Sequence, residues 1–531
     1  MTAASSRSLE AYEPEAMRAW HLPGVVERFA HEVEVADAAL RGLNVPVTID
    51  GRPVATEDGI DSFDPADPTR IVARSGSASA AVIDEAVAVA NRTHRLWSAV
   101  PPAGRAEVLF AAADALRADR DRIAAIEVFE AGKPWSEADG DLCEAIDFLE
   151  FYGRAIVELD ASLVVQSPLG EANSAGYRAR GVTAVISPWN FPLAIPMGMV
   201  SAAIAAGNAV VFKPAEQTPA IAYEIVKAFE AAGLPEGVLS FTPGRGEVAG
   251  ARLVEHPDVA TIEFTGSRAV GLAINQRAAA SSHSSRYVKR VIAEMGGKNA
   301  IVVDSDADLD EAVPEVAKAA FGFAGQKCSA CSRLIVVGRR YDEVIERLAA
   351  HADTFILGHP KDGATSVGPV IDADAHERLL SVIDGTRGTV RYRHQRLPET
   401  GWFVPPTIVD GLESEAPLRR DEQFGPLLAV VHANDLDHAF ELANATDYAL
   451  TAGLFSRSPD AIARAGELQA GNIYVNRGTT GAVVGRQPFG GMLQSGTGPK
   501  AGTLDTLRAL SSAWVVTENT MRQGFAADLV T

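Results

Sequence analysis

The sequence predicts an α/β protein made of two doubly wound lobes and a small additional β element. The first observation is a length of 531 residues, which exceeds the size at which one hydrophobic core keeps growing. The second is an alternation of strand-like runs with helical periods after Gly181, and the third is a new series of the same kind near Lys298. Such alternation is typical of parallel sheets with helices on both faces.

Helices are expected to open the first lobe. From about 78 to 157 apolar residues recur at helical spacing, and Gly132 is placed as a helix-ending residue. From Gly181 the pattern changes to short β-branched runs separated by helices, one of which starts after Thr218-Pro219. The predicted strands of this series are VTAVIS, AVVFK, VLSF and VATIEF.

The second lobe is predicted from a similar series. It contains the strand IVVD, a helix capped by Asp306 that runs to about Phe323, and the strand LIVV after Cys331. Two leftover segments, 161–181 and 513–531, are interpreted as extended or irregular pieces. The strand-like SAWVV in the second of them could add to the edge of another sheet.

The composition argues against several classes of partner. Hydrophobic residues make up 47% and charged residues 22%, and no run approaches the roughly 20 apolar residues that span a bilayer. A net charge of −21 would repel phosphate backbones and anionic lipid, so neither nucleic acid nor a membrane is expected as a partner. Three cysteines fit a reducing compartment, and an N-terminus with Glu10, Glu13 and Glu15 is unlike a targeting peptide. A cytoplasmic protein is expected.

Cys328 lies in FGFAGQKCSACSRLIVV, between the end of a predicted helix and the start of a strand. An isolated cysteine is typically a buried, unreactive thiol, so this segment alone does not assign a role. With Cys331 it forms C-x-x-C, but zinc would need two more ligands, and Cys143 is the one other cysteine. A redox dithiol normally follows a strand and opens a helix, which is the reverse of the order here. No metal site is expected.

A set of seven motifs is more informative than any one of them. FTGSRAVG follows a strand and opens a helix, where pyrophosphate can bind, but it has only Gly266 and Gly271. The motifs are SPWNFP (187–192), FKPAEQTP (212–219), FTGS (264–267), EMGGKN (294–299), GQKC (325–328), EQFGP (422–426) and PFGG (488–491). In this order they resemble the aldehyde dehydrogenase superfamily over nearly the whole chain, and the resemblance implies the fold of that superfamily.

The resemblance implies three catalytic residues whose types suit the oxidation of an aldehyde to an acid. Cys328 matches the nucleophile, because a thiol is partly ionised near neutral pH and attacks a carbonyl carbon well. The Asn190 side chain and the Cys328 backbone N–H match the oxyanion hole. Glu294 matches the base that activates water to hydrolyse the thioester. Relatives that pass the acyl group to coenzyme A or phosphate lack this carboxylate.

The resemblance also implies NAD as the cofactor. A carboxylate at Glu216 would accept the ribose 2′-hydroxyl and repel a 2′-phosphate, which favours NAD over NADP. The residues implied to bind NAD are Ser187, Pro188, Trp189, Lys213, Glu216, Gly266, Ser267, Glu422 and Phe424.

A division of the chain follows from the same resemblance. The implied units are an N-terminal arm (1–55), an NAD-binding domain (56–160, 182–297 and 495–512), a catalytic domain (298–494) and oligomerisation segments (161–181 and 513–531). A homo-oligomer, dimeric or larger, is expected.

Two stretches, 322–336 and 472–502, resemble the 1-pyrroline-5-carboxylate dehydrogenase family, which oxidises glutamate γ-semialdehyde in proline catabolism. The length leaves no room for the proline dehydrogenase barrel of longer bifunctional relatives. The implied substrate residues are Ser329, Gly481 and Ala482 for the α-carboxylate, Phe191 and Phe489 for the aliphatic part, and Glu137, or equally Asp139, for the ammonium group. Two alternatives stay open: another aldehyde as substrate, or a non-catalytic nucleotide-binding protein with the same fold.

Overall fold

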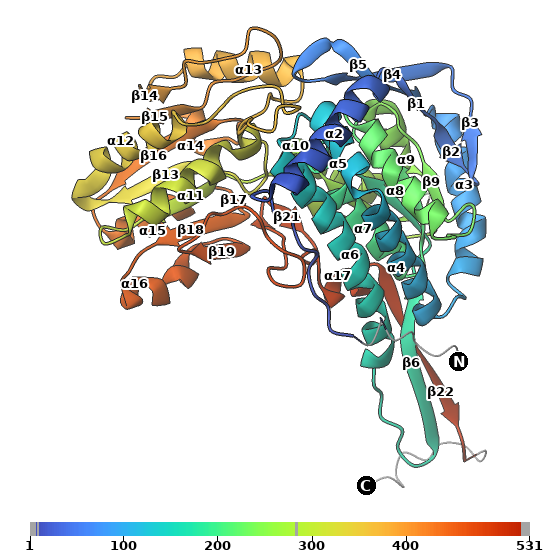
Figure 1. Cartoon of the computed structure of the whole chain (residues 1–531). Coiled ribbons are helices and arrows are strands. Elements are labelled where there is room, and N and C mark those ends of the chain that lie inside the picture. Colours follow the sequence, from blue (N-terminus) through green and yellow to red (C-terminus); the bar gives the residue numbers. More distant parts are fainter. Residues whose placement is uncertain (1–6, 8–9, 282–284, 522–531) are drawn as a thin grey trace.

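The computed structural model describes residue 7 and residues 10–281 and 285–521. It has two lobes, each built around one large sheet, and a two-stranded arm that projects from the first lobe (Figure 1). In Figure 1 the first lobe is mainly blue to green and the second is yellow to orange. The predicted architecture of two α/β lobes with a small β element is confirmed.

The first lobe contains an eight-stranded sheet with the order β21-β11-β10-β7-β8-β9-β2-β3. From β7 the chain winds to β8 and β9 on one side and to β10 and β11 on the other, and these five strands pair in parallel. The winding therefore reverses between β7 and β10, as a doubly wound sheet requires. The strands are β7 (Val182–Ile186), β8 (Ala209–Lys213), β9 (Leu239–Phe241), β10 (Val259–Thr265), β11 (Arg290–Glu294) and β21 (Gly496–Thr497).

Helices cover both faces of this sheet, and each face has its own hydrophobic core. Apolar residues of α4 to α8 and α17 pack on one face, and those of α3, α9 and α10 pack on the other. Gly132 follows the end of α5 with φ of 66°, as predicted for a helix-ending glycine. The helices are α3 (Ala80–Trp97), α4 (Pro102–Ala118), α5 (Arg120–Glu130), α6 (Trp135–Ser162), α7 (Ala194–Ala205), α8 (Pro219–Ala231), α9 (Ala251–Glu255), α10 (Arg268–Ser281) and α17 (Leu504–Ala509).

The second lobe contains a seven-stranded sheet with the order β14-β15-β16-β13-β12-β18-β19. It winds in both directions from β12, and its edge strand β14 runs antiparallel to β15. Its strands are β12 (Asn299–Val303), β13 (Cys331–Val337), β14 (Thr389–Arg393), β15 (Thr407–Asp410), β16 (Leu427–Ala433), β18 (Thr451–Phe455) and β19 (Asn472–Val475). Its helices are α11 (Leu309–Phe321), α12 (Tyr341–Ala352), α13 (Ala373–Asp384), α14 (Pro417–Arg420), α15 (Leu436–Asn444) and α16 (Pro459–Ala463). Beside it, β17 (Tyr448–Ala449) pairs with β20 (Met492–Leu493).

The cap of α11 differs from the prediction. The Asp308 side chain accepts a hydrogen bond from the backbone N–H of Asp310 at 3.0 Å, so Asp308 is the capping residue. Asp306 instead accepts a hydrogen bond from the Ser456 hydroxyl at 2.9 Å. Two aspartates that precede one helix are equivalent in a local pattern, and the contact with distant Ser456 decides between them.

The N-terminal segment is more structured than an arm at 1–55 implies. Helix α2 (Pro23–Ala39) packs on α5, and the hairpin of β2 (Val47–Ile49) and β3 (Arg52–Val54) extends the eight-stranded sheet through β9. A separate three-stranded sheet joins β1 (Leu43–Val45), β4 (Asp58–Asp64) and β5 (Asp67–Ser77). These pairings join segments that are far apart in sequence, so a local pattern does not reveal them.

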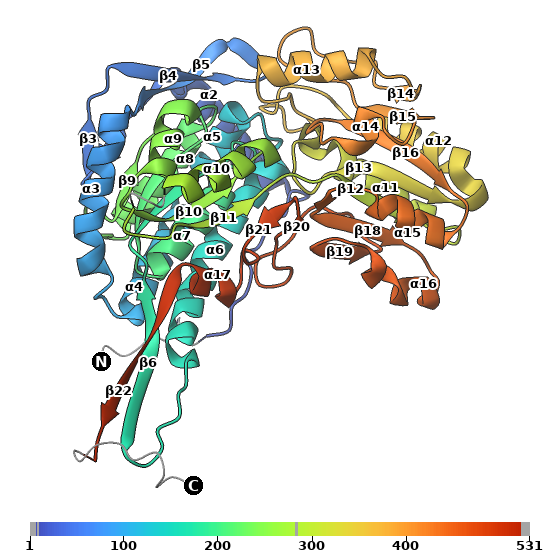
Figure 2. The ribbon, with the colours of Figure 1, turned by 180° about the vertical axis from the view of Figure 1, so that it is seen from behind.

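The projecting arm consists of β6 (Glu171–Ala179) and β22 (Ser511–Asn519), which pair antiparallel along nine residues (Figure 2). Val515 and Val516 on β22 are 60% and 51% exposed. The part of 513–531 beyond Met521 lies outside the described residues. None of the described helices has the length and apolarity needed to cross a membrane.

Candidate active site

Cys328 lies on a loop at the amino end of β13, where the second lobe faces the first. Just before it, Phe323 and Ala324 have φ of 51° and 52°, a left-handed conformation that non-glycine residues rarely adopt and that often occurs at functional sites. The Asn299 side-chain amide donates to the backbone carbonyls of Cys328 at 2.7 Å and Ala330 at 2.9 Å. The backbone around the thiol is therefore fixed from the second lobe.

The thiol of Cys328 is less acidic than the sequence interpretation assumed. Burial and the nearby carboxyl groups of Glu422, Glu294 and Glu144 raise its pKa to about 12. The expectation of a partly ionised thiol is therefore wrong for this state of the protein, because both burial and negative neighbours disfavour a thiolate. The thiol needs a base before it can attack. Cys331 is also buried, and its sulfhydryl donates to the Arg333 carbonyl at 3.4 Å.

Asn190 is brought to the nucleophile from the first lobe. It follows β7, is buried, and its side-chain amide nitrogen donates to the backbone carbonyl of Gln326 at 2.9 Å. An amide nitrogen carries two hydrogens, so this bond leaves one for another acceptor. The Asn190 amide, an uncharged donor, is therefore bound to the loop at Gln326, two positions before Cys328 in the sequence.

Glu294 is the last residue of β11. Its carboxylate accepts a hydrogen bond from the backbone N–H of Gly491 at 3.3 Å. Burial raises the pKa of Glu294 to about 8, although Gly491 and the nearby Lys500 act in the opposite direction. A carboxyl group that titrates near neutral pH is suited to act as a general base.

The predicted cofactor residues of the first lobe meet at its topological switch point. Ser187, Pro188 and Trp189 follow β7, and Gly266 and Ser267 follow β10, so the two groups lie at the carboxyl ends of neighbouring strands. Ligands of doubly wound sheets bind at this crevice. The Ser187 hydroxyl is buried there without a hydrogen-bond partner among the described residues, as expected of a group that awaits a polar ligand.

Two of the three contacts of the further candidate cofactor residues join the two lobes. Lys213 at the end of β8 forms an ion pair with Glu216 at 3.1 Å. Glu422 of the second lobe accepts a hydrogen bond from the Gly297 N–H at 2.9 Å. The ring of Phe424 meets that of Trp189 edge to face, with centroids 5.5 Å apart. These contacts bring together ionic, polar and aromatic groups of the kinds that suit the ribose and ring parts of a dinucleotide.

The predicted substrate residues lie on several elements of the two lobes. The Ser329 side chain is buried beside Cys328, and the carbonyl of Gly481 accepts a hydrogen bond from Arg477 at 3.0 Å. Phe489 pairs through its backbone with Ala501. The Phe191 ring lies 4.2 Å from the Nζ atom of the buried Lys133. Ala482 directly follows Gly481 in the loop after β19.

The two predicted ammonium-binding carboxylates are both engaged. Glu137 on α6 forms an ion pair with Lys327 at 2.7 Å, next to the nucleophile. Asp139 is fully buried and pairs with Arg18 and with Arg120 on another face of α6. Asp139 therefore does not reach the site.

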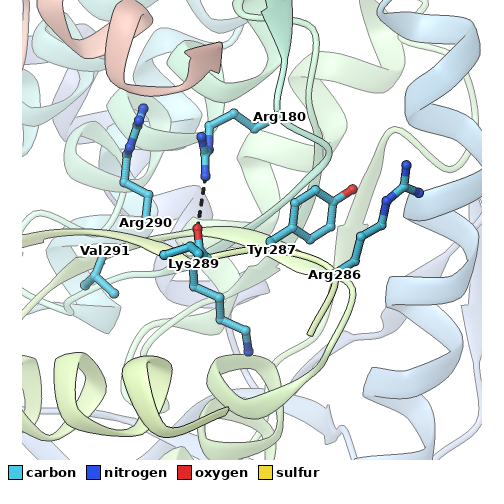
Figure 3. A pocket seen from close by; sticks show the side chains of 7 residues that line it. Arg180, Arg286, Tyr287, Lys289, Arg290 and Val291 are labelled. Atoms are coloured by element: carbon cyan, nitrogen blue, oxygen red, sulfur yellow. Dashed lines mark hydrogen bonds between the residues drawn. The ribbon is translucent and has the colours of Figure 1, made fainter. Parts of the chain in front are cut away.

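A basic hollow of about 640 Å³ lies apart from these residues (Figure 3). In it Arg180 donates to the backbone carbonyl of Val288 at 3.3 Å, and Arg290 donates to the carbonyl of Ser511 at 3.4 Å. The lining residues include none of the predicted site residues, so the hollow is not the candidate active site. It lies beside the base of the β6–β22 arm.

Comparison with known proteins identifies the family. The family model described as aldehyde dehydrogenase family matches residues 53–515. The chain belongs to the aldehyde dehydrogenase family. A 1-pyrroline-5-carboxylate dehydrogenase from Geobacillus kaustophilus (strain HTA426) is 42% identical over 513 residues, which cover 96% of this chain and 99% of that protein.

Solved structures of other aldehyde dehydrogenase family members have the same fold. A 1-pyrroline-5-carboxylate dehydrogenase from Thermus with bound NAD matches with a TM-score of 0.93 at 37% identity, covering 98% of this chain and all of the other (100%). Proline utilization A from Bdellovibrio bacteriovorus matches with a TM-score of 0.94 at 43% identity. That match covers 97% of this chain, which spans only 54% of the longer protein. The predicted family is confirmed.

Sequence reasoning missed three residues that shape this aldehyde dehydrogenase site. Asn299 and Gln326 lie inside the quoted motifs EMGGKN and GQKC, but their role in fixing the loop is visible only from their long-range hydrogen bonds. Glu144 lies two helical turns beyond Glu137 on α6, and its carboxyl group contributes to the raised pKa of Cys328. Helical spacing from Glu137 was the available signal for it.

Proposed function

We propose that this chain is an NAD-dependent dehydrogenase that oxidises L-glutamate γ-semialdehyde to L-glutamate in proline catabolism, through a thioester on Cys328. The observation that carries the proposal is that Asn190 and Glu294 of the first lobe lie close to the loop that carries Cys328. The similarity to 1-pyrroline-5-carboxylate dehydrogenases over nearly the full chain supports the choice of substrate.

The reaction begins with activation of the Cys328 thiol. The carboxyl groups of Glu422 and Glu294 both lie near the thiol and can take its proton, so a base remains when Glu294 alone is replaced. Sulfur then bonds to the aldehyde carbon and forms a thiohemiacetal. The free N–H of the Asn190 amide and the Cys328 backbone N–H stabilise the negative charge that develops on the aldehyde oxygen.

NAD, when bound, supplies the hydride acceptor that converts the thiohemiacetal to a thioester. Lys213 and Glu216 would hold its adenosine ribose, the turns after β7 and β10 its pyrophosphate, and Glu422 with Phe424 its nicotinamide end. Glu294 then takes a proton from water, which attacks the thioester carbon and releases glutamate with the Cys328 sulfur as leaving group. The Glu216 carboxylate favours NAD over NADP.

The substrate's charged groups are recognised by different elements. The Ser329 hydroxyl and the backbone N–H groups of Gly481 and Ala482 suit the α-carboxylate. Among the described residues Glu144 forms no ion pair, whereas Glu137 is neutralised by Lys327. We therefore propose Glu144 as the ammonium partner and Glu137 as the residue that fixes Lys327. Phe191 and Phe489 would flank the aliphatic part.

Ser329→Ala is expected to weaken capture of glutamate semialdehyde far more than oxidation of propanal, which has no carboxylate. Hydrogen bonds to a charged group contribute roughly 1.5–3 kcal/mol, or about 10- to 150-fold in kcat/KM. Most of the loss should appear in KM, because the anchor is remote from the reacting carbon. Steady-state NADH formation with both aldehydes measures it. An equal loss for the two would assign Ser329 to support of the nucleophile.

Glu144→Gln is expected to raise KM for glutamate semialdehyde by about 10-fold without changing propanal kinetics, because it removes one charge-assisted partner of the ammonium group. Glu137→Gln is the matched variant on the same helix. It should impair both aldehydes, since it leaves the buried Lys327 unpaired next to Cys328. A selective loss in Glu137→Gln, with Glu144→Gln unchanged, would exchange the two assignments.

We propose that the protein works in the cytoplasm as a homo-oligomer joined through the β6–β22 arm. Support comes from exposed Val515 and Val516 on a strand that pairs on one side only within the described part of the chain. The division into NAD-binding domain, catalytic domain and oligomerisation segments belongs to the same proposal. Sedimentation of the full chain tests it, and a monomer at micromolar concentration would contradict it.

A further inference from the structure

Residues 10–20, here called the N-terminal strap, lie across helices α4, α5 and α6 and form ion pairs with them. Arg18 forms ion pairs with Asp121 and Asp139, and the Glu15 carboxylate pairs with Arg117 at 2.9 Å. The strap's backbone is held as well, since the Glu15 N–H donates to Asp147 at 2.6 Å. These contacts with helices of the first lobe make the strap a fixed element.

Near the start of the strap, the ring of Tyr12 packs on the loop that follows β19. A Cβ atom placed on Gly485 would lie 2.6 Å from Cε1 of Tyr12, so the ring rests directly on the glycine backbone. Phe151 of α6 meets the Tyr12 ring edge to face at 5.7 Å and closes the other side of Gly485. Gly485 has φ of 76°, which a residue with a side chain tolerates poorly. Only glycine fits this position without displacement of the ring.

The same loop carries the proposed carboxylate anchor. Gly481 and Ala482 precede a turn in which the backbone N–H of Arg486 donates to the Val483 carbonyl at 3.0 Å. Val484 of this turn is buried in the first-lobe core, three residues from Gly481. The Arg477 guanidinium and the Gln487 side chain also bond to residues 480–483, and the Tyr12 ring packs on Gly485.

The charged groups around Tyr12 lie near its hydroxyl and do not account for its contact with Gly485. Its hydroxyl is buried, and its nearest charged neighbours are Asp147, which raises the pKa of the phenol, and Arg486, which lowers it. The contact with Gly485 is made by ring carbons and not by the hydroxyl. The ring rather than the hydroxyl is therefore the supporting group.

We propose that the N-terminal strap, through Tyr12, positions the loop that binds the substrate carboxylate, and so makes selectivity for an amino-acid aldehyde depend on a segment more than 450 residues away in sequence. Tyr12 is a positioning residue: it does not touch substrate in this proposal. The inference rests on the proposed function, because it assigns Gly481 and Ala482 to the substrate carboxylate.

Tyr12→Ala in the full-length protein is the test, with glutamate semialdehyde and propanal as paired substrates. We expect KM for glutamate semialdehyde to rise about 10-fold and propanal kinetics and KM for NAD to stay within about twofold, since only the anchor loop is released. Tyr12→Phe, which keeps the ring, should retain wild-type selectivity. Equal losses for both aldehydes, or unchanged selectivity in Tyr12→Ala, would overturn the proposal.

Gly485→Ala provides a second route if Tyr12→Ala folds poorly. The added methyl meets the Tyr12 ring, so it should produce the same selective rise in KM. Gly233→Ala is its matched control, with φ of 73° and no atom within 4 Å of the added Cβ, and it should not change selectivity. Wild-type protein that fails to prefer glutamate semialdehyde would refute the proposed function. Preference that persists in both Tyr12→Ala and Gly485→Ala would refute the strap alone.

Discussion

Cys328→Ala is expected to abolish NADH formation while the protein still binds NAD. The substitution removes the sulfur that forms the proposed covalent intermediate, whereas the candidate cofactor residues at the ends of β7 and β10 are left unchanged. Steady-state assays should show at least about a 10⁴-fold loss, as is typical when a nucleophile that acts with other catalytic groups is removed. NAD binding is measured separately by calorimetry.

Cys331→Ala is the control for the loss of a thiol from the same segment. Cys331 lies in β13 with its sulfhydryl bonded to the Arg333 carbonyl, so its removal changes packing but no reacting group. Turnover should stay near that of the wild type. Substantial NADH formation by Cys328→Ala would end the covalent mechanism.

Glu294→Gln should form the thioester and hydrolyse it slowly. The attacking water then lacks its base, which typically costs about 10²–10⁴ in rate. Rapid mixing should show about one NADH per active site followed by a stall, as an acyl-enzyme accumulates. Steady turnover at the wild-type rate would remove Glu294 from the mechanism.

The pH dependence of the wild type follows from the same residue. Burial raises the pKa of Glu294 to about 8, so the basic carboxylate form is gained as pH rises through that value. Turnover limited by hydrolysis should therefore increase from pH 6 through 8, where about half of the group is carboxylate, and level off above about pH 9. The residual turnover of Glu294→Gln should lack this rise, because a glutamine amide does not titrate.

Much of the fold could be predicted because it is encoded in local periodicity. The helix α3 and the buried strands β7, β8 and β10 lie where apolar spacing placed them. The β2–β3 hairpin and the choice of Asp308 over Asp306 as a cap depend on contacts with distant residues. A local pattern does not contain those contacts.

The site divides in the same way. Cys328, Asn190 and Glu294 could be proposed from motifs, because each occupies a short stretch with a distinctive sequence. The raised pKa of the Cys328 thiol could not, since it depends on Glu422 and Glu144 from other elements. The pairing of Glu137 with Lys327 likewise joins residues 190 positions apart, and it redirects the ammonium assignment to Glu144.

The most direct test of the account is the ratio of kcat/KM for glutamate semialdehyde to that for propanal, followed as NADH formation by the wild-type protein. Carboxylate and ammonium recognition together should favour glutamate semialdehyde by at least about 10-fold, since each charged contact contributes roughly 1.5–3 kcal/mol. NADH formation with that preference is the predicted result. Equal efficiency with both aldehydes, or no NADH from glutamate semialdehyde, would contradict the account.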